Sequence, residues 1–139
     1  MTEPPRQDSV ALMETYLRER VQNVLAYMET KGFDPEVFET LRSRDRQAYL
    51  FGQGRSKLQC IVAGISPQWS QPGEKRVTDT MHSMHLPDSD GLSKAVDIIS
   101  VSRQWKWPAF YIALQRAYHL QGFKTLERIG DLDHGEWQG

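Results

Sequence analysis

Apolar residues recur every three or four positions through residues 9–31, a spacing that predicts an amphipathic helix. The apolar positions are Val10, Met13, Leu17, Val21, Val24, Leu25 and Met28. Ser9 is suited to cap this helix, and Gly32 is suited to end it. We expect a scaffold helix packed on the domain; the alternative is that its apolar stripe binds a partner. Residues 1–8 are polar and contain Pro4 and Pro5, which predicts a flexible N-terminus.

The remaining pattern alternates between helical and extended segments. It predicts a short strand over residues 35–41, a helix from 44 or 45 to 51, a buried strand over 94–100 and a helix from 107 to about 120. Residues 63–80 are rich in Gly, Pro and polar groups, which favours a surface loop. We therefore predict a small α+β fold in a single domain, residues 1–139, with an antiparallel sheet flanked by helices.

Composition restricts the classes of partner. The 139 residues carry 17 basic and 18 acidic side chains, a formal net charge of -1, so no basic excess points to nucleic acid. No stretch approaches the roughly 18 apolar residues of a membrane span. The N-terminus lacks an apolar signal segment, so we expect synthesis in the cytoplasm without a signal peptide. Cys60, the one cysteine, lies in an apolar run and is expected to be a small buried residue.

Three polar residues near the predicted strands are candidate metal ligands. Asp97 interrupts an apolar strand, and a buried carboxylate needs a partner, which a metal ion or an arginine would supply. His85 and His134 complete a set of two imidazoles and one acid, which are ligands that zinc binds. Asp131 precedes the last histidine by three residues and is a candidate base. Taken singly, each histidine also fits a structural or solvated position.

Other polar residues compete for the same roles. His82 is three residues before His85, so both would face one metal on a helical turn. Asp88 and Asp90 suggest a calcium loop, but the later bidentate Glu of an EF-hand is absent, which favours a tight acidic turn. His119 lies on the predicted helix after residue 107 and is expected to be a partly exposed structural residue.

Three short motifs carry a family resemblance. Residues 83–85 read S-M-H, residues 95–97 read A-V-D and residues 131–137 read D-L-D-H-G-E-W. The chain resembles the zinc D,D-carboxypeptidase and L-alanyl-D-glutamate endopeptidase family, which includes phage endolysins and cleaves the peptide stems of bacterial peptidoglycan. That family's pattern is an S-x-H, a downstream A-V-D or A-x-D, and a terminal D/E-x-x-H, often followed by x-E-W.

Upstream segments extend the resemblance over about residues 30–139. Residues 42–50 and 53–56 are similar to the family's R-S-x-x-x-Q-x-x-L and Q-G-R-S/T segments, and 105–111 to the segment that leads into its helix. Two features depart from the family pattern. Residues 86–94 lengthen the connection between the histidine and the aspartate, which implies an outward loop. Residues 124–130 hold no W-G-G-x-W segment, so the pocket wall is expected to differ.

The resemblance implies a role for each matched residue. His85, Asp97 and His134 would hold Zn²⁺ at one edge of the sheet, and Asp131 would act as the base. Arg42 would pair with a carboxylate of the substrate stem, or else form a structural ion pair with a nearby acid. Ser83 would bind substrate or hold the His85 loop. Four neighbours are expected in supporting or solvent-facing positions: Gln47, Arg55, Asp133 and Glu136.

The implied function is a zinc peptidase that hydrolyses peptidoglycan stem peptides, as an endolysin-like L-alanyl-D-glutamate endopeptidase. One alternative keeps the family and changes the bond, to a D-alanyl-D-alanine carboxypeptidase. The other is a zinc-stabilised module that binds the cell wall and lacks catalysis. A peptidoglycan stem peptide is the expected partner of a monomer, which would act on the wall after release from the cell.

Overall fold

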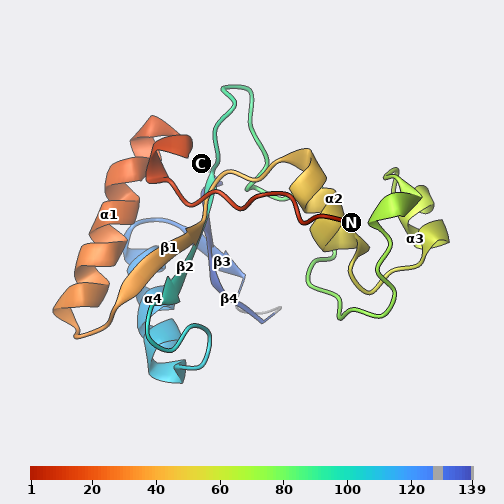
Figure 1. Cartoon of the computed structure of the whole chain (residues 1–139). Coiled ribbons are helices and arrows are strands. Elements are labelled where there is room, and N and C mark those ends of the chain that lie inside the picture. The colour runs from red at the N-terminus through yellow and green to blue at the C-terminus, as the bar shows by residue number, and fades with distance from the viewer. Residues whose placement is uncertain (127–129, 139) are drawn as a thin grey trace.

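The computed structural model describes residues 1–126 and 130–138, which form four strands and several helices (Figure 1). In chain order the elements are η1 (Val10–Leu12), α1 (Thr15–Thr30), β1 (Pro35–Glu39), α2 (Arg44–Gly52), α3 (Lys57–Val62), η2 (Pro67–Trp69), β2 (Ala95–Ser100), α4 (Pro108–Leu120), β3 (Lys124–Leu126) and β4 (Asp131–Glu136). The strands form one antiparallel sheet in the order β1-β2-β4-β3. The predicted α+β class is confirmed.

Helices α1 and α4 pack together against one face of the sheet, and α2 and α3 lie away from them, on the far side of the strands in Figure 1. The hydrophobic core fills the layer between the first pair of helices and the sheet. Val96 and Ile98 of β2 belong to this core together with Leu17 of α1 and Leu114 of α4. Since side chains alternate along a strand, Asp97 faces the opposite side of the sheet.

The predicted first helix is divided in two. The Ser9 hydroxyl accepts a hydrogen bond from Ala11 N and so caps η1, whereas α1 begins only at Thr15. Between them the chain is extended, because Glu14 N donates to Ser93 O and Ser93 N donates to Leu12 O. This pairing with a distant segment replaces the helical hydrogen bonds there, which no local pattern predicts. Met13 is nevertheless fully buried, as its place in the apolar series indicates.

Strands β1 and β2 and helices α2 and α4 agree with the predicted segments to within about two residues at each end. Helix α3 was not predicted, although Ser56 and Gln59 form a capping box at its start. Cys60 on this helix is buried, as expected. Strand β3 was not predicted either, since its three residues are too few to show an alternation of apolar and polar side chains. The sequence also predicts a last segment over about residues 128–137, and Arg128, at its start, lies outside the described residues.

The loop between residues 86 and 94 projects from the body of the molecule, as its length predicts (Figure 1). Asp88 Oδ1 accepts hydrogen bonds from the backbone N–H groups of Asp90 and Leu92, and Gly91 supplies the left-handed conformation of the turn with φ +74°. Within the part of the chain that the structure describes, none of the helices combines the length and apolar character required to cross a bilayer.

Gly135 permits the close packing of β4 on α4, which generates a prediction. A Cβ atom added at Gly135 would lie 2.6 Å from the ring of Tyr118, a fully buried side chain. We expect Gly135→Ala to lower the free energy of unfolding by about 1–3 kcal/mol, because the ring must shift in a packed core. Urea denaturation measures the loss. Gly73→Ala is the control, since nothing lies within 4 Å of a Cβ there, and equal stability of both variants would contradict the packing.

Candidate metal centre

A row of three polar residues crosses the sheet on the face opposite α1 and α4. Asp97 of β2 is paired with Glu39 of β1 on one side and with His134 of β4 on the other. Directly opposed residues of antiparallel strands place their side chains on the same face, about 4.5–5.5 Å apart. The register therefore brings Asp97 and His134 together, although 37 residues separate them along the chain.

His85 comes from the loop segment after Ser83 and is held by several hydrogen bonds. The Ser83 hydroxyl accepts from His85 N at 3.1 Å, and Arg42 N donates to His85 O at 2.8 Å. The imidazole Nδ1 lies 2.6 Å from Thr40 O, which follows β1. A carbonyl oxygen only accepts, so Nδ1 carries the hydrogen and Nε2 is the free nitrogen of the neutral ring. The side chain is 1% exposed.

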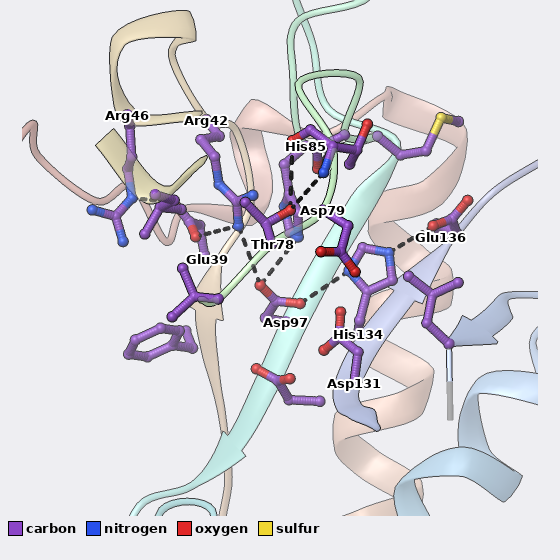
Figure 2. A pocket seen from close by; sticks show the side chains of 18 of the residues that line it. Glu39, Arg42, Arg46, Thr78, Asp79, His85, Asp97, Asp131, His134 and Glu136 are labelled. Atoms are coloured by element: carbon purple, nitrogen blue, oxygen red, sulfur yellow. Dashed lines mark hydrogen bonds and ion pairs between the residues drawn. The ribbon is translucent and has the colours of Figure 1, made fainter. Parts of the chain in front are cut away.

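The three predicted ligands converge, as Figure 2 shows. His85 Nε2 lies 3.1 Å from Asp97 Oδ2, and His134 Nδ1 lies 3.1 Å from Asp97 Oδ1. One donor atom from each residue lies within 4.8 Å of the other two. His82, the competing histidine, is exposed and belongs to no such group among the described residues. The sequence predicts the site at one edge of the sheet, whereas these donors lie on the face of its two central strands.

The chemistry of this donor set fits a divalent cation. His85 Nε2 is buried and has no hydrogen-bond partner among the described residues, while it faces the carboxylate of Asp97. A lone pair that faces an anion at 3.1 Å is repelled, and either a proton on Nε2 or a cation between the two groups removes the repulsion. Zinc binds such a nitrogen together with a second imidazole and a carboxylate, which leaves a fourth position open.

Electrostatics keep the acid of this group ionised. Burial alone would raise the pKa of Asp97, but the neighbouring His85 and the hydrogen bond with His134 hold it well below its usual range. Burial likewise opposes charge on His134, yet hydrogen bonds to Asp97 and Glu136 raise its pKa to about 10. The hydrogen bond from His134 lowers the pKa of Glu136 in turn. Asp97 therefore offers an anionic oxygen at neutral pH.

Glu136 orients the second imidazole from behind. Its Oε1 accepts a hydrogen bond from His134 Nε2 at 2.8 Å, so that Nδ1 is directed toward Asp97. Metal-binding histidines commonly donate their other ring N–H to a carboxylate or a carbonyl oxygen, which fixes the tautomer. Glu136 meets this condition for His134, and Thr40 O meets it for His85. Of the two positions expected for Glu136, supporting or solvent-facing, its burial and this contact fit the supporting one.

Two further acids lie beside Asp97, at the start of β4. Oxygens of Asp131 and Asp133 lie within 4.8 Å of each other and of an Asp97 oxygen. Burial, followed by the negative charges of Asp97 and Asp131, raises the pKa of Asp133 to about 9. Asp133 also accepts a hydrogen bond from Trp105 Nε1 at 3.4 Å. The predicted base, Asp131, thus borders the donor group.

Arg42 lies on the other side of Asp97, within a buried ionic network. Its Nη2 contacts Glu39 Oε1 at 2.7 Å and lies 3.7 Å from Asp97 Oδ2, and its Nη1 donates to Gln47 Oε1 at 2.8 Å. Arg46 contacts the second oxygen of Glu39 and also pairs with Glu3 at 3.0 Å. Figure 2 shows the guanidinium of Arg42 between Glu39 and Asp97. The guanidinium is held in a fixed plane next to the donor group.

These groups line a cleft of about 990 Å³. One wall is the loop of residues 76–80, which Arg55 holds through Thr78 O and Gln47 holds through Thr80 O, at 2.8 and 2.6 Å. Figure 2 shows Thr78 and Asp79 of this loop beside the donor group. Ser83 also lines the cleft, and Phe38 and Trp105 form an aromatic part of the lining. Glu3 also lines the cleft and pairs with Arg46, so the N-terminal segment, which was expected to be flexible, lies at the cleft opening.

Several of these residues were not predicted from the sequence. Glu39 has a detectable signal, since acidic and basic residues at positions 39, 42 and 46 recur at three- and four-residue spacing. Thr40 contributes only its backbone carbonyl, for which its side chain gives no indication. Phe38 and Trp105 reach the cleft through tertiary packing. His119 is exposed and contacts Thr125 Oγ1, as expected for a structural residue.

Comparison with known proteins gives a match at the level of the fold. No protein-family model and no curated protein matches the chain. A crystal structure of the L-Ala D-Glu endopeptidase ChiX from Serratia marcescens matches with a TM-score of 0.54 and 19% sequence identity. The match covers 99% of this chain and 89% of that one. The two proteins therefore share a fold along nearly their whole length.

The donor group generates a prediction of metal content. We expect His85→Ala, Asp97→Ala and His134→Ala each to reduce zinc from near one ion per chain to background, because each removes one of three ligands. Metal analysis of the purified, dialysed proteins measures this. His82→Ala is the matched control and should retain the ion. Full occupancy in all three ligand variants would show that the site lies elsewhere.

The network around Glu39 generates a prediction of stability. Glu39→Gln removes the negative charge that faces two buried guanidinium groups, and breaking a buried ion pair in this way costs about 3–5 kcal/mol. We expect a loss of this size in urea denaturation with chelator present, so that metal binding does not contribute. Glu36→Gln, an exposed change on the same strand, serves as the control. A loss below about 1 kcal/mol would contradict the network's structural role.

Proposed function

We propose that the protein is a zinc-dependent peptidase that hydrolyses peptidoglycan stem peptides at the L-alanyl-D-glutamate bond. The observation that carries this proposal is the group of His85, Asp97 and His134, in which His85 Nε2 is buried without a partner at the wall of a large cleft. The fold shared with an L-Ala D-Glu endopeptidase supports the choice of substrate. We further propose that the protein works as a monomer, on the wall after release.

Asp131 is proposed to move the proton of the reaction. A zinc ion held by His85, Asp97 and His134 would act as a Lewis acid on the scissile carbonyl and would lower the pKa of water. One carboxylate oxygen of Asp131 accepts the proton of the attacking water, and the same oxygen then delivers it to the nitrogen of the leaving amine. An oxygen of Asp131 within 4.8 Å of an oxygen of Asp97 supports this role.

Arg42 and Ser83 are proposed to bind the substrate. Two of the five N–H donors of Arg42 are occupied by Gln47 and Glu39, and this fixes the plane of the group. We propose that a remaining N–H pairs with a carboxylate of the stem peptide, next to the reacting carbonyl. The Ser83 hydroxyl accepts from His85 N, so its own hydrogen is left to donate to a substrate oxygen.

Digestion of defined muropeptides tests the proposed bond. We expect the zinc-loaded protein to release a fragment that ends in L-alanine, identified by mass spectrometry, and chelation to abolish the release. Release of terminal D-alanine would instead indicate a D,D-carboxypeptidase. Sedimentation with cell walls without any cleavage would indicate a zinc-stabilised binding module.

Asp131→Asn tests the base separately from the metal. We expect the variant to keep its zinc and to lose about 10²–10⁴-fold in kcat, because the amide cannot accept the proton. Steady-state hydrolysis of a stem peptide and metal analysis of the same sample measure the two effects. Asp8→Asn, an exposed change outside the cleft lining, should behave as the unmodified protein. Unchanged turnover in Asp131→Asn would remove this residue from the mechanism.

A further inference from the structure

The exposed indole of Trp105 lies close to the group of His85, Asp97 and His134. Trp105 lines the cleft and is 50% exposed, whereas the other three tryptophans, all of them in the described part of the chain, are less exposed than this. Its Nε1 donates to Asp133 Oδ2 at 3.4 Å, and an Asp133 oxygen lies within 4.8 Å of an oxygen of Asp97. A large apolar surface is therefore available to a ligand beside the metal donors.

The backbone that presents Trp105 is held in an unfavourable conformation. Gln104 has φ 52° and is the one residue other than glycine with a positive φ in the described chain. Its N–H donates to Ser100 O at 2.9 Å, and its carbonyl accepts from Tyr111 Oη at 2.6 Å. Such strain persists where the surroundings fix it, and it occurs often at functional sites. The turn from Ser100 to Gln104 sets the direction of the following indole.

Neighbouring side chains leave one aromatic surface open. The ring of Phe38 meets Trp105 edge to face, with centroids 5.1 Å apart and planes at 82°. The guanidinium of Arg6 lies 3.8 Å above the Phe38 ring and so covers a face of it. Trp105 is thus held by Phe38 on one side and by Asp133 at its N–H, while half of its surface faces solvent. A rigid indole of this kind offers a large contact area to a ligand at little cost in conformational entropy.

We infer that Trp105 stacks on the pyranose ring of the muramic acid to which the stem peptide is attached, an inference that rests on the proposed function. In the stem, L-alanine is joined to the sugar through its lactyl group. Cleavage after L-alanine leaves one residue, about 3.3–3.6 Å of extended chain, and the lactyl group between the scissile carbonyl and the ring. The sugar must then lie close to the donor group, where the indole is.

The chemistry of the two surfaces is complementary. One face of a pyranose consists mainly of C–H groups, whose partial positive charge is attracted to the negative face of an aromatic ring. Acids next to the indole, Asp131 and Asp133, offer oxygens to hydroxyl groups at the edge of the sugar. A cut at the terminal D-alanine would place four residues between the bond and the sugar, and the indole would then lie far from the ring.

Binding of a cleavage product tests the stacking. N-acetylmuramoyl-L-alanine contains the sugar and lacks the L-alanyl-D-glutamate bond, and D-lactoyl-L-alanine is the same ligand without the sugar. In isothermal titration calorimetry with the zinc-loaded full chain, we expect the sugar-containing ligand to bind about tenfold more tightly. Trp105→Ala should reduce this ratio to about twofold or less and leave the affinity for D-lactoyl-L-alanine unchanged. Trp105→Phe should keep most of the ratio, because it retains a ring face and loses only the N–H.

The outcomes separate the stacking from other roles of Trp105. Equal affinities of the unmodified protein for the two ligands would overturn the stacking. An equal loss of both affinities in Trp105→Ala would also overturn it, because such a loss would indicate an effect through Asp133. Trp105→Phe provides the comparison if the alanine variant does not fold. The ligands are not substrates, so the result is independent of hydrolysis. Failure to cleave stem peptides would count against the proposed function, while a sugar-dependent affinity would still support the indole site.

Discussion

The carboxylate of Asp97 is the group on which the rest of the site depends. It lies in a strand that is buried along its whole length, where an isolated negative charge would be very unfavourable. Two imidazoles and one guanidinium surround it, each from a different part of the chain: a loop, a neighbouring strand and the segment before α2. The attraction of His134 and Arg42 to this anion joins two of these parts, while His85 Nε2 faces it without a hydrogen bond and is free to bind a cation.

The supporting contacts form a second layer around this anion. Glu39 holds Arg42 and Arg46, Glu136 holds His134, and Thr40 O holds His85. Each of these acceptors lies on or directly next to a strand of the sheet, so the rigid sheet fixes the direction of every group that faces the cleft. The N-terminal segment and the loop of residues 76–80 are attached to the same network through Arg46 and Gln47. The geometry at the donor group is therefore coupled to the cleft walls.

The sequence was sufficient to predict the elements with strong local patterns and the convergence of three polar residues. Asp97 was detectable because a charge interrupts an apolar strand, and His85 and His134 because short motifs surround them. The position of the site was not predictable, since strand order decides whether β2 and β4 are central. The break before α1 depends on hydrogen bonds to Ser93, 79 residues beyond Glu14. Trp105 reaches the cleft through a turn with a positive φ at Gln104, which no local pattern in the sequence indicates.

The long connection between the first histidine and the aspartate is closed at its base. Lys94 N donates to Met84 O, and Asp88 N donates to Leu92 O, so the chain enters and leaves the projection through paired backbone. These backbone hydrogen bonds separate the tip around Gly91 from His85 and Asp97, the two side chains on either side of the loop. Because the base is closed by backbone hydrogen bonds, the tip is suited to the insertion of a reporter peptide.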